Sequence, residues 1–345
     1  MADGRGKALV TGGAGMIGRR LVRHLARGGY EVVVLDLTGP RSEVARRNPE
    51  LRSMARDVRW IRGDTRKESD VRAAMAGVGT VFHLAAGPSF VHYSRSPVAE
   101  TSNAITGFLT VLDAARHAGV RRVVHASTSA VYEGNPVPYR EDMPLSPPDL
   151  KSLAKRTTED IAGIYAARYG MTTISLRPFS VYSDDETEKG PLANVVSLFV
   201  WAVLAGRTPV LWGDGRQTRD FVYVDDVARA FALAAEVPEP ATQPVNVGTG
   251  VETTHRELVR LIAAACGVEA EFRFSGVPVE PYASRLLADT TRAEKVLGFR
   301  AETALAAGVA KVVEQARVSG SYGRAVTGLA LAQEPPAFSD ALRGE

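Results

Sequence analysis

A glycine-rich turn between an apolar run and a helical pattern constrains the fold of this chain more than any other feature. Residues 7–11 (KALVT) have the continuous apolar character of a buried strand, and residues 17–27 have the spacing of an amphipathic helix. The segment between them carries three glycines at intervals of three residues. A strand, a glycine turn and a helix in this order predict a dinucleotide-binding Rossmann fold.

Each glycine of the turn has a separate physical task. Gly12 permits the tight turn, Gly15 lets the backbone approach a pyrophosphate, and Gly18 allows the helix to pack closely on the sheet. Met16 and Ile17 stand at the start of the helix, where backbone N–H groups face the phosphates. The turn therefore predicts the seat of the cofactor phosphates.

Apolar runs and amphipathic segments alternate through the first half of the chain. The expected strands are 31–36, 80–84, 122–126 and 172–177, and the expected helices are 69–76, 97–118 and 150–168. Near-continuous apolar strands separated by helices are typical of parallel sheets covered on both faces. We expect an α/β fold of the Rossmann type with a doubly wound parallel sheet.

The alternation of apolar strands and amphipathic helices becomes less regular after Arg177, where proline and glycine become frequent. We expect residues 1–177 to form the dinucleotide-binding domain, with 216–250 returning to it through segments 225–235 and 245–247. Segments 178–215 and 251–325 are expected to form a smaller substrate-binding domain. Residues 326–345 are expected to be a peripheral tail.

Composition excludes several classes of protein. Of 345 residues 45% are hydrophobic, which is enough for a large core without staples, and the single cysteine, Cys266, excludes an internal disulfide framework or a cysteine-rich zinc site. The net charge is only +3, with arginines scattered along the chain, which does not indicate a nucleic-acid partner. No apolar run is long enough to cross a membrane. We expect a cytoplasmic protein with a small-molecule substrate and no bound metal.

Asp36, at the end of the second expected strand, bears on cofactor choice. It lies 18 residues after Gly18, where a carboxylate can accept hydrogen bonds from a ribose 2′-OH and repel a 2′-phosphate. This favours NAD, but Arg41 follows closely and could accommodate a phosphate. The cofactor is therefore expected to be NADH or NADPH.

Further motifs resemble the extended short-chain dehydrogenases/reductases over about residues 7–315. They are Thr11–Gly18, Gly63-Asp64, His83-Leu84-Ala85-Ala86, Ser127–Tyr132, Leu176–Phe179, Gly213-Asp214-Gly215, Thr218–Val227 and Asn246-Val247-Gly248. Most members of that family act on nucleotide sugars as epimerases, dehydratases, decarboxylases or 4-keto reductases. The resemblance implies that Asp64 and Thr65 lie near the adenine, Ala85 and Ala86 line the dinucleotide groove, and Pro178 to Ser180 lie near the nicotinamide amide.

The chain departs from this family at the catalytic tyrosine. The family uses a Ser or Thr, a Tyr, and a Lys four residues after the Tyr, so that phenol and ammonium share a helix face. Here Thr128 and Lys155 fill the first and last roles, but the tyrosine position is occupied by Lys151. Either Lys151 replaces the acid, since a neighbouring ammonium depresses its pKa, or it is a solvated side chain without a role.

The expected diphosphate site is also incomplete. Arg219 is kept, and Ser89, Thr128 and Arg219 are the candidate substrate contacts. Where the family has a second diphosphate arginine and a neighbouring acid, this chain has Val279 and Tyr282, although Arg285 is close in sequence. Ser180 replaces the family's frequent asparagine, and Ser183 replaces a glycine.

The sequence leaves three functions open. The main expectation is an NAD(P)H-dependent ketoreductase of antibiotic biosynthesis, because the tyrosine-less pattern resembles atypical ketoreductases that act on angucyclinones, which are aromatic polyketides. A phenol beside the substrate ketone would then supply the proton, since its pKa is near that of tyrosine. The alternatives are a nucleotide-sugar epimerase, dehydratase or 4-keto reductase, and a non-catalytic dinucleotide-binding protein. The sequence leaves the oligomeric state open.

Overall fold

A seven-stranded parallel sheet forms the centre of the molecule. The computed structural model describes residues 5–39, 42, 48–87, 90–239, 241–277, 283–320 and 322. The strand order is β11-β6-β5-β4-β1-β2-β3, with every pair parallel. The strands are β1 (Lys7–Thr11), β2 (Glu31–Asp36), β3 (Arg59–Arg62), β4 (Thr80–His83), β5 (Arg122–Ala126), β6 (Thr172–Pro178) and β11 (Thr242–Val247). The expected doubly wound α/β sheet is confirmed.

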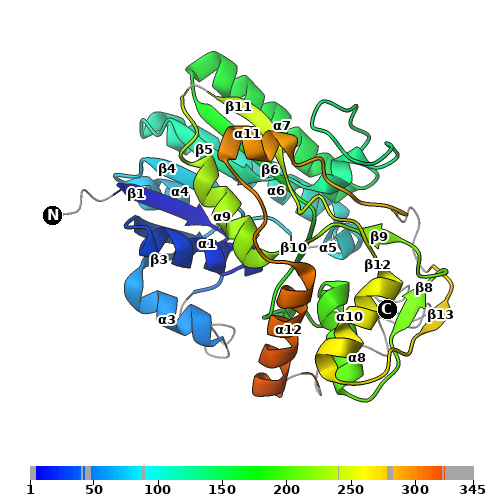
Figure 1. Cartoon of the computed structure of the whole chain (residues 1–345). Coiled ribbons are helices and arrows are strands. Elements are labelled where there is room, and N and C mark those ends of the chain that lie inside the picture. The colour runs from blue at the N-terminus through cyan, green and yellow to red at the C-terminus, as the bar shows by residue number, and fades with distance from the viewer. Residues whose placement is uncertain are drawn as a thin grey trace.

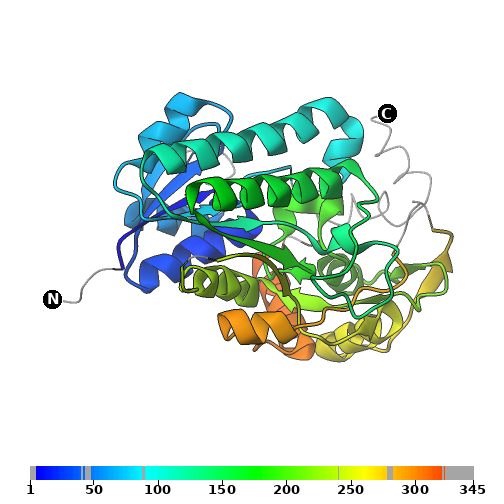
Figure 2. The same cartoon turned by 90° about the horizontal axis from the view of Figure 1, so that it is seen from above.

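Helices cover both faces of this sheet (Figures 1 and 2). One face carries α1 (Met16–Arg27), α3 (Pro49–Asp57), α9 (Val224–Ala234) and α11 (Thr291–Leu297), and the other carries α4 (Glu68–Met75), α6 (Pro97–His117) and α7 (Leu150–Tyr169). The short helix α5 (Phe90–Arg95) precedes α6, and the 3-10 turn η1 (Ser129–Tyr132) follows β5. Figure 2 shows α6 and α7 lying side by side as the longest helices.

Alternation along the strands builds the two cores. Val10 and Val34 point to the face of α1, where they pack with Leu21. Leu9, one residue earlier on β1, points to the opposite face and packs with Phe108 of α6. Because successive strand side chains point to opposite faces, a continuous apolar strand fills both cores at once.

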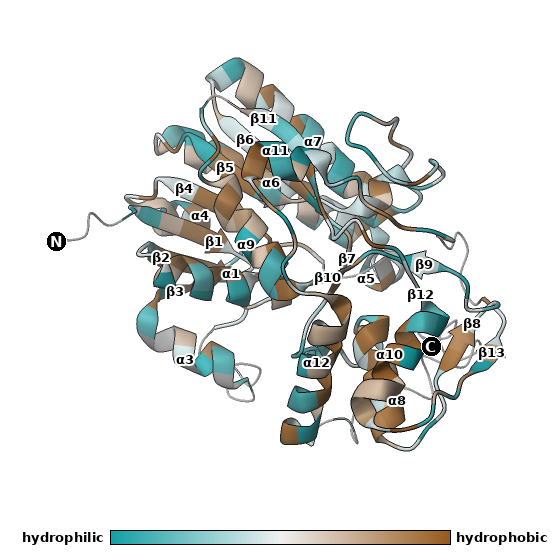
Figure 3. Ribbon diagram, viewed as in Figure 1, coloured by the Kyte–Doolittle hydropathy of each residue, from teal (hydrophilic) through white to brown (hydrophobic). Residues whose placement is uncertain are grey.

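A smaller lobe lies beside the carboxyl ends of the strands and has its own core (Figure 1). Its elements are β7 (Ser180–Tyr182), the 3-10 turn η2 (Thr187–Leu192), α8 (Val195–Leu204), β8 (Val210–Trp212), β9 (Thr218–Arg219), β10 (Phe221–Tyr223), β12 (Thr253–Thr254), α10 (His255–Cys266), β13 (Arg273–Ser275) and α12 (Leu305–Ser319). Figure 3 shows α8 as mostly hydrophobic, and it packs between α10 and α12.

The structure differs from the sequence-based expectation in three places. Helix α3 and strand β3 were not expected, and α11, which was assigned to the smaller domain, packs on the sheet because Ala293, Leu297 and Phe299 join the core under α9. We therefore propose the expected two-part division with the α11 segment moved to the sheet domain. The expected tail, 326–345, and Arg41 lie outside the described residues.

The described part of the chain lacks two kinds of structural feature. None of its helices is long and apolar enough to cross a membrane. Nor do its His, Cys, Asp and Glu side chains gather in a group of three or more that could hold a metal ion.

Candidate functional site

The turn after β1 forms a cradle that only glycine can occupy at two positions. Gly12 has φ +72°, and a Cβ on it would lie 2.7 Å from the backbone nitrogen of Ala85. A Cβ on Gly18 would overlap the carbonyl oxygen of Gly12. Gly15 is less crowded within the protein, since its Cβ would stand 3.2 Å from that same oxygen. The space beside Gly15 is thus open for a ligand, as a pyrophosphate requires.

A cavity of about 470 Å³ opens at this turn. It is lined by Gly12, Ala14, Gly15, Leu35, Asp36, Leu37, Thr38, Gly63, Asp64, Thr65, Arg66, Leu84, Ala85, Ala86, Gly87, Glu100, Asn103 and Glu188. It lies at the carboxyl ends of β1, β2 and β4, where ligands bind in open α/β sheets. The glycine cradle and the groove fit a dinucleotide, and seven of the predicted cofactor residues line this one cavity: Gly12, Gly15, Asp36, Asp64, Thr65, Ala85 and Ala86.

Asp36 is held in place by the turn that it faces. Its two carboxylate oxygens accept hydrogen bonds from the backbone N–H groups of Ala14 (2.9 Å) and Thr38 (2.7 Å). Burial raises the pKa of Asp36, and these two hydrogen bonds oppose that rise by favouring the charged form. The carboxylate is therefore oriented at the cavity before any ligand arrives.

Arg66 organises the end of the cavity where an adenine is expected. Its guanidinium donates to both oxygens of Asp64 and to Asn103 Oδ1 at 2.6 Å. Arg66 lowers the pKa of Asp64 through these bonds. Sequence reasoning found Asp64 and Thr65 but missed Arg66, whose partner Asn103 is 37 residues away on α6.

The expected catalytic residues come from β5 and α7. Thr128 follows β5 and caps η1, where its hydroxyl oxygen accepts from the N–H of Ala130 at 3.3 Å. Lys155, on α7, is only 7% exposed, and its Nζ donates to the carbonyl oxygen of Ala126 at 2.7 Å. Burial, together with the nearby Lys155 charge, lowers the pKa of His83 to about 3. Lys155 therefore lies at the carboxyl end of β5, beside the last residue of β4.

Lys151 lies one turn before Lys155 on α7 and is half-buried. Burial is the main cause of its lowered pKa, with Lys189 lowering it further and Asp149 opposing the shift. The pKa of Lys155 falls to about 8, through burial and then through the charge of Lys151. The charge of Lys151 thus adds to burial in holding Lys155 toward the neutral form.

The start of α7 fixes the position of this pair. Asp149 caps the helix by accepting from the N–H of Ser152 at 2.8 Å, and Ser152 Oγ accepts from the N–H of Asp149 at 3.3 Å. This reciprocal capping box sets where the helix begins and hence which side chains share a face with Lys155.

Tyr132 does not replace the missing phenol. Its hydroxyl donates to Asn246 Oδ1 at 2.7 Å and accepts from Arg177 at 2.6 Å, and its side chain is fully buried. Arg177 also forms a buried ion pair with Glu159, at 2.5 Å. These contacts tie β6 to α7 and to the strand-end Asn246, which is a structural task.

Arg219 lies on β9 and has an acidic neighbour that was not predicted. Its guanidinium donates to the carbonyl oxygen of Thr218 at 2.7 Å. Burial raises the pKa of the half-buried Glu133, which follows η1, and the charge of Arg219 partly offsets that rise. Arg285, the possible substitute for a second diphosphate arginine, is paired with Glu252 at 2.6 Å.

Five further predicted cofactor residues do not line the cavity. Met16, Ile17 and Gly18 form the first turn of α1, and Pro178 and Ser180 stand at the junction of β6 and β7, with Ser180 Oγ accepting from Asn194. Ser89, Val279 and Tyr282 lie outside the described residues. Glu188, from η2, was not predicted and joins the cavity from the smaller lobe.

Comparison with known proteins agrees with this site. The model of the NAD dependent epimerase/dehydratase family matches residues 8–248. The chain belongs to this family. The expected extended short-chain dehydrogenase/reductase relationship is thereby confirmed, as is the family's use of NAD.

Individual relatives cover almost the whole chain. A UDP-glucose 4-epimerase of Mycolicibacterium smegmatis is 38% identical over 89% of this chain and 97% of its own length. The solved UDP-glucose 4-epimerase of Thermotoga maritima, with UDP-glucose, is 30% identical, with a TM-score of 0.81 over 91% of this chain and 99% of that chain. The Thermus thermophilus UDP-glucose 4-epimerase, complexed with NAD, is 31% identical, with a TM-score of 0.76 over 90% and 99% of the two chains. These relatives give no support to the expected polyketide ketoreductase and favour the nucleotide-sugar alternative.

Proposed function

We propose that this chain is an NAD-dependent enzyme that oxidises or reduces a hydroxyl-bearing carbon of a nucleotide sugar, as an epimerase, dehydratase or 4-keto reductase. The observation that carries the proposal is the glycine-cradled cavity at the carboxyl ends of β1, β2 and β4, with the buried Lys155 bonded at the carboxyl end of the neighbouring strand β5. Family membership and relatives named as UDP-glucose 4-epimerases support the substrate class. The NAD complex of the Thermus thermophilus relative supports the cofactor.

Holding the cofactor falls to residues of the sheet domain. The turn at Gly12 and Gly15 would receive the pyrophosphate, Asp36 the adenosine ribose, and Lys155 the nicotinamide ribose. When bound, the nicotinamide supplies reversible two-electron oxidation and reduction. The protein's own task is to position the substrate carbon and to move one proton at its oxygen.

Lys151 is the group that we assign to this proton. It occupies the helix position one turn before Lys155, is half-buried, and has a lowered pKa. A neutral amine can take the hydroxyl proton during oxidation, and the resulting ammonium can return it during reduction. Thr128 would hold the same oxygen by a hydrogen bond, and Arg219 would contribute one cation toward the phosphates.

The test supplies candidate substrates to the purified protein. UDP-glucose, UDP-galactose and dTDP-glucose are incubated with it in the presence of NAD, and products are separated by chromatography and identified by NMR. Conversion of at least one nucleotide sugar is expected, with loss of conversion in Lys155→Met. If NAD binds but no nucleotide sugar is converted, the proposed substrate class is wrong.

A ketoreductase of aromatic polyketides remains the second candidate, because Glu133 lies near Arg219. A carboxylate beside the one retained phosphate-binding arginine weakens its attraction for a diphosphate and suits a substrate without phosphate. With a phenolic ketone, the substrate's own phenol would donate the proton, so Lys151→Ala would stay active. Loss of NADH absorbance with a quinonoid hydroxy-ketone, and much slower loss with its O-methyl derivative, is the expected signature. NAD binding without turnover of either substrate class would indicate a non-catalytic binding protein.

A further inference from the structure

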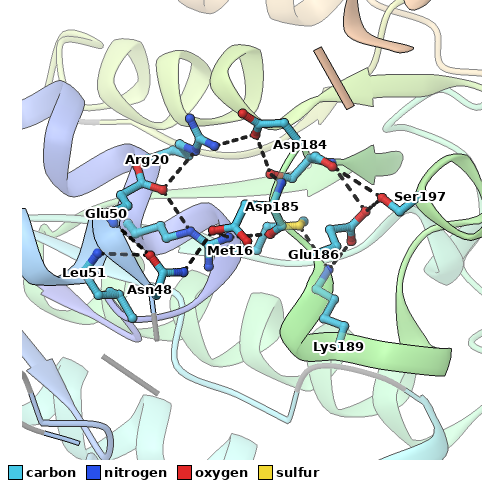
Figure 4. Close-up of polar contacts among 12 residues, drawn as sticks. Met16, Arg20, Asn48, Glu50, Leu51, Asp184, Asp185, Glu186, Lys189 and Ser197 are labelled. Carbon is cyan, nitrogen blue, oxygen red and sulfur yellow. Dashed lines mark hydrogen bonds and ion pairs between the residues drawn. The ribbon is translucent and has the colours of Figure 1, made fainter. Parts of the chain in front are cut away.

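Residues 183–189 of the smaller lobe, named the strap here, are fastened across the start of α1. Asp184 accepts from Arg20 at 2.5 Å, and the carbonyl oxygen of Asp185 accepts from Arg19 at 2.5 Å. The Asp185 carboxylate lies 3.2 Å from the same Arg19 guanidinium. Figure 4 shows Asp184 and Asp185 on the side of Arg20 and Asn48, while Glu186 points to Ser197 and Lys189. The two arginines follow the glycine turn directly, so the strap is tied to the phosphate-binding end of the site.

Helix α3 completes the attachment from the other side. Glu50, on the first turn of α3, lies 3.1 Å from Arg19 and 3.5 Å from Arg20, and Asn48 donates to Asp185 at 2.9 Å. Arg19 is only 4% exposed. Buried charges of this kind hold a fixed arrangement, because separating any one of them leaves an uncompensated charge.

The strap is also fixed within itself. The buried carboxylate of Glu186 accepts from Ser197 Oγ at 2.7 Å and from Lys189 Nζ at 2.7 Å, and Lys189 Nζ lies 3.0 Å from Met16 Sδ (Figure 4). Residues on both sides of position 188 are thus anchored. The backbone at Glu188 therefore has little freedom to move away from the cavity.

Glu188 is the strap residue that lines the cofactor cavity. Its side chain is exposed there and hydrogen-bonds to Asn48, which stands at the end of the β2–α3 connection. Asp36 lines the same cavity from β2. Two carboxylates from segments about 150 residues apart therefore line the cavity in which the dinucleotide is expected.

We propose that Glu188 is a second determinant of cofactor choice, which together with Asp36 excludes the 2′-phosphate of NADP. The inference rests on the dinucleotide binding in the proposed function, but not on the identity of the substrate. The 2′-phosphate adds up to two negative charges to the dinucleotide, and each carboxylate nearby repels it. Among the described residues, the charged groups that act on Glu188 are Arg19 and Asp185, and Arg19 is already engaged by Asp185 and Glu50.

The two carboxylates are expected to act differently on NAD itself. Asp36 is oriented to accept hydrogen bonds from the ribose hydroxyls. Its loss should therefore weaken NAD binding and also allow NADP to bind. Glu188 acts through its charge, so its loss should allow NADP to bind while changing the affinity for NAD less. This difference separates a repulsive role for Glu188 from a general contribution to the site.

The experiment measures dissociation constants of NADH and NADPH by fluorescence, on protein freed of bound dinucleotide. The variants are Glu188→Gln, Asp36→Asn and the double variant, with Glu314→Gln, on the exposed face of α12, as the control for loss of one acidic charge. In Glu188→Gln, NADPH is expected to bind about tenfold more tightly while NADH changes by less than about threefold. The double variant should favour NADPH further, and the gain should shrink at high salt because screening weakens repulsion.

Two results would overturn the inference. One is an unchanged NADPH affinity in Glu188→Gln together with relaxed selectivity in Asp36→Asn, and the other is wild-type protein that prefers NADPH. If wild-type protein bound neither dinucleotide, the proposed function would fall as well. NADH binding without turnover of a nucleotide sugar leaves this inference standing while rejecting the proposed substrate.

Discussion

Lys151 stands one helical turn before Lys155, and its ammonium makes Lys155 harder to charge. The pKa of Lys155 is lowered to about 8 by burial and by Lys151, while Glu159 opposes the shift. Lys151 is lowered by burial and by Lys189, against the pull of Asp149. A tyrosine at position 151 would instead be neutral when protonated and would gain charge on losing its proton. The substitution therefore reverses the charge change that accompanies proton transfer.

We expect Lys151→Ala to lower kcat on a nucleotide sugar by about 10²–10⁴, the usual contribution of a general acid–base. Removing its positive charge should also raise the pKa of Lys155, which shifts any limb of the pH–rate profile due to Lys155 toward higher pH. Lys295→Ala, at an exposed lysine on α11, is the matched control and should leave both kcat and profile unchanged. Full activity in Lys151→Ala with the same pH profile would show that the acid lies elsewhere.

Lys155→Met should make the folded protein more stable near neutral pH while weakening its binding of NAD. The folded protein lowers the pKa of Lys155 from 10.5 to about 8, so between these values the unfolded chain binds more protons than the folded one. The free energy of unfolding contributed by this group therefore rises with pH across that window and is least favourable below it. The methionine variant should lack this rise, unfold a few degrees higher near neutral pH, and bind NAD weakly. Urea unfolding of both proteins at several pH values measures the difference.

At the scale of elements, the strap joins the smaller lobe to α1 and α3 by buried ion pairs. Arg19→Met removes contacts to Glu50 and Asp185, after which Glu50 keeps Arg23 at 2.9 Å and the Asp185 carboxylate keeps the Asn48 amide. We expect a loss of about 3–5 kcal/mol in the free energy of unfolding, with weaker NAD binding. Arg5→Met removes an exposed ion pair with Glu236 and should cost less than about 1 kcal/mol. Equal losses in the two variants, from denaturant unfolding, would contradict the role given to the strap.

The sequence predicted elements with a continuous apolar run and missed those without one. Strands β1, β2 and β5 lie centrally and are buried on both faces, so their patterns were plain. Strand β3 (RWIR) stands at the edge of the sheet with half-exposed residues, and therefore carries no apolar run. Helix α3 did carry a local signal, since Asn48 caps it and Pro49 begins it, but its apolar face is only Leu51 and Met54.

The site residues likewise fall into those that the sequence predicted and those that it missed. Glycines and Asp36 follow their strands at fixed spacing, so sequence alone brought them to one cavity. Glu188 reaches that cavity from a segment about 150 residues away from Asp36, which the sequence alone does not show. Arg66 directly follows the predicted Asp64 and Thr65, but its contact with Asn103 on α6 depends on the fold. Whether Lys151 is solvated depends on how α7 packs against the rest of the protein. The helical spacing in the sequence does not give that packing.

At the scale of the whole molecule, a bound dinucleotide would contact both the sheet domain and the strap, so its binding should stabilise the complete fold. A ligand that binds only the folded state stabilises it by about 2.7 kcal/mol at one hundred times its dissociation constant. For a chain of this size we expect NAD to raise Tm by about 5 °C at that concentration. The rise should grow with the logarithm of the NAD concentration.

Gly15→Val tests whether this stabilisation acts through the phosphate turn. A Cβ at Gly15 meets only the Gly12 carbonyl oxygen, at 3.2 Å, so the variant should fold, but its branched side chain would fill the pyrophosphate space. Its Tm without ligand should stay close to that of the wild type, while the increase with NAD disappears. Gly18→Ala is expected to lower Tm with or without NAD, since its Cβ overlaps the backbone of the turn. A Gly15→Val protein that NAD still stabilises would place the dinucleotide elsewhere, and the cavity between β1, β2 and the strap would lose its function.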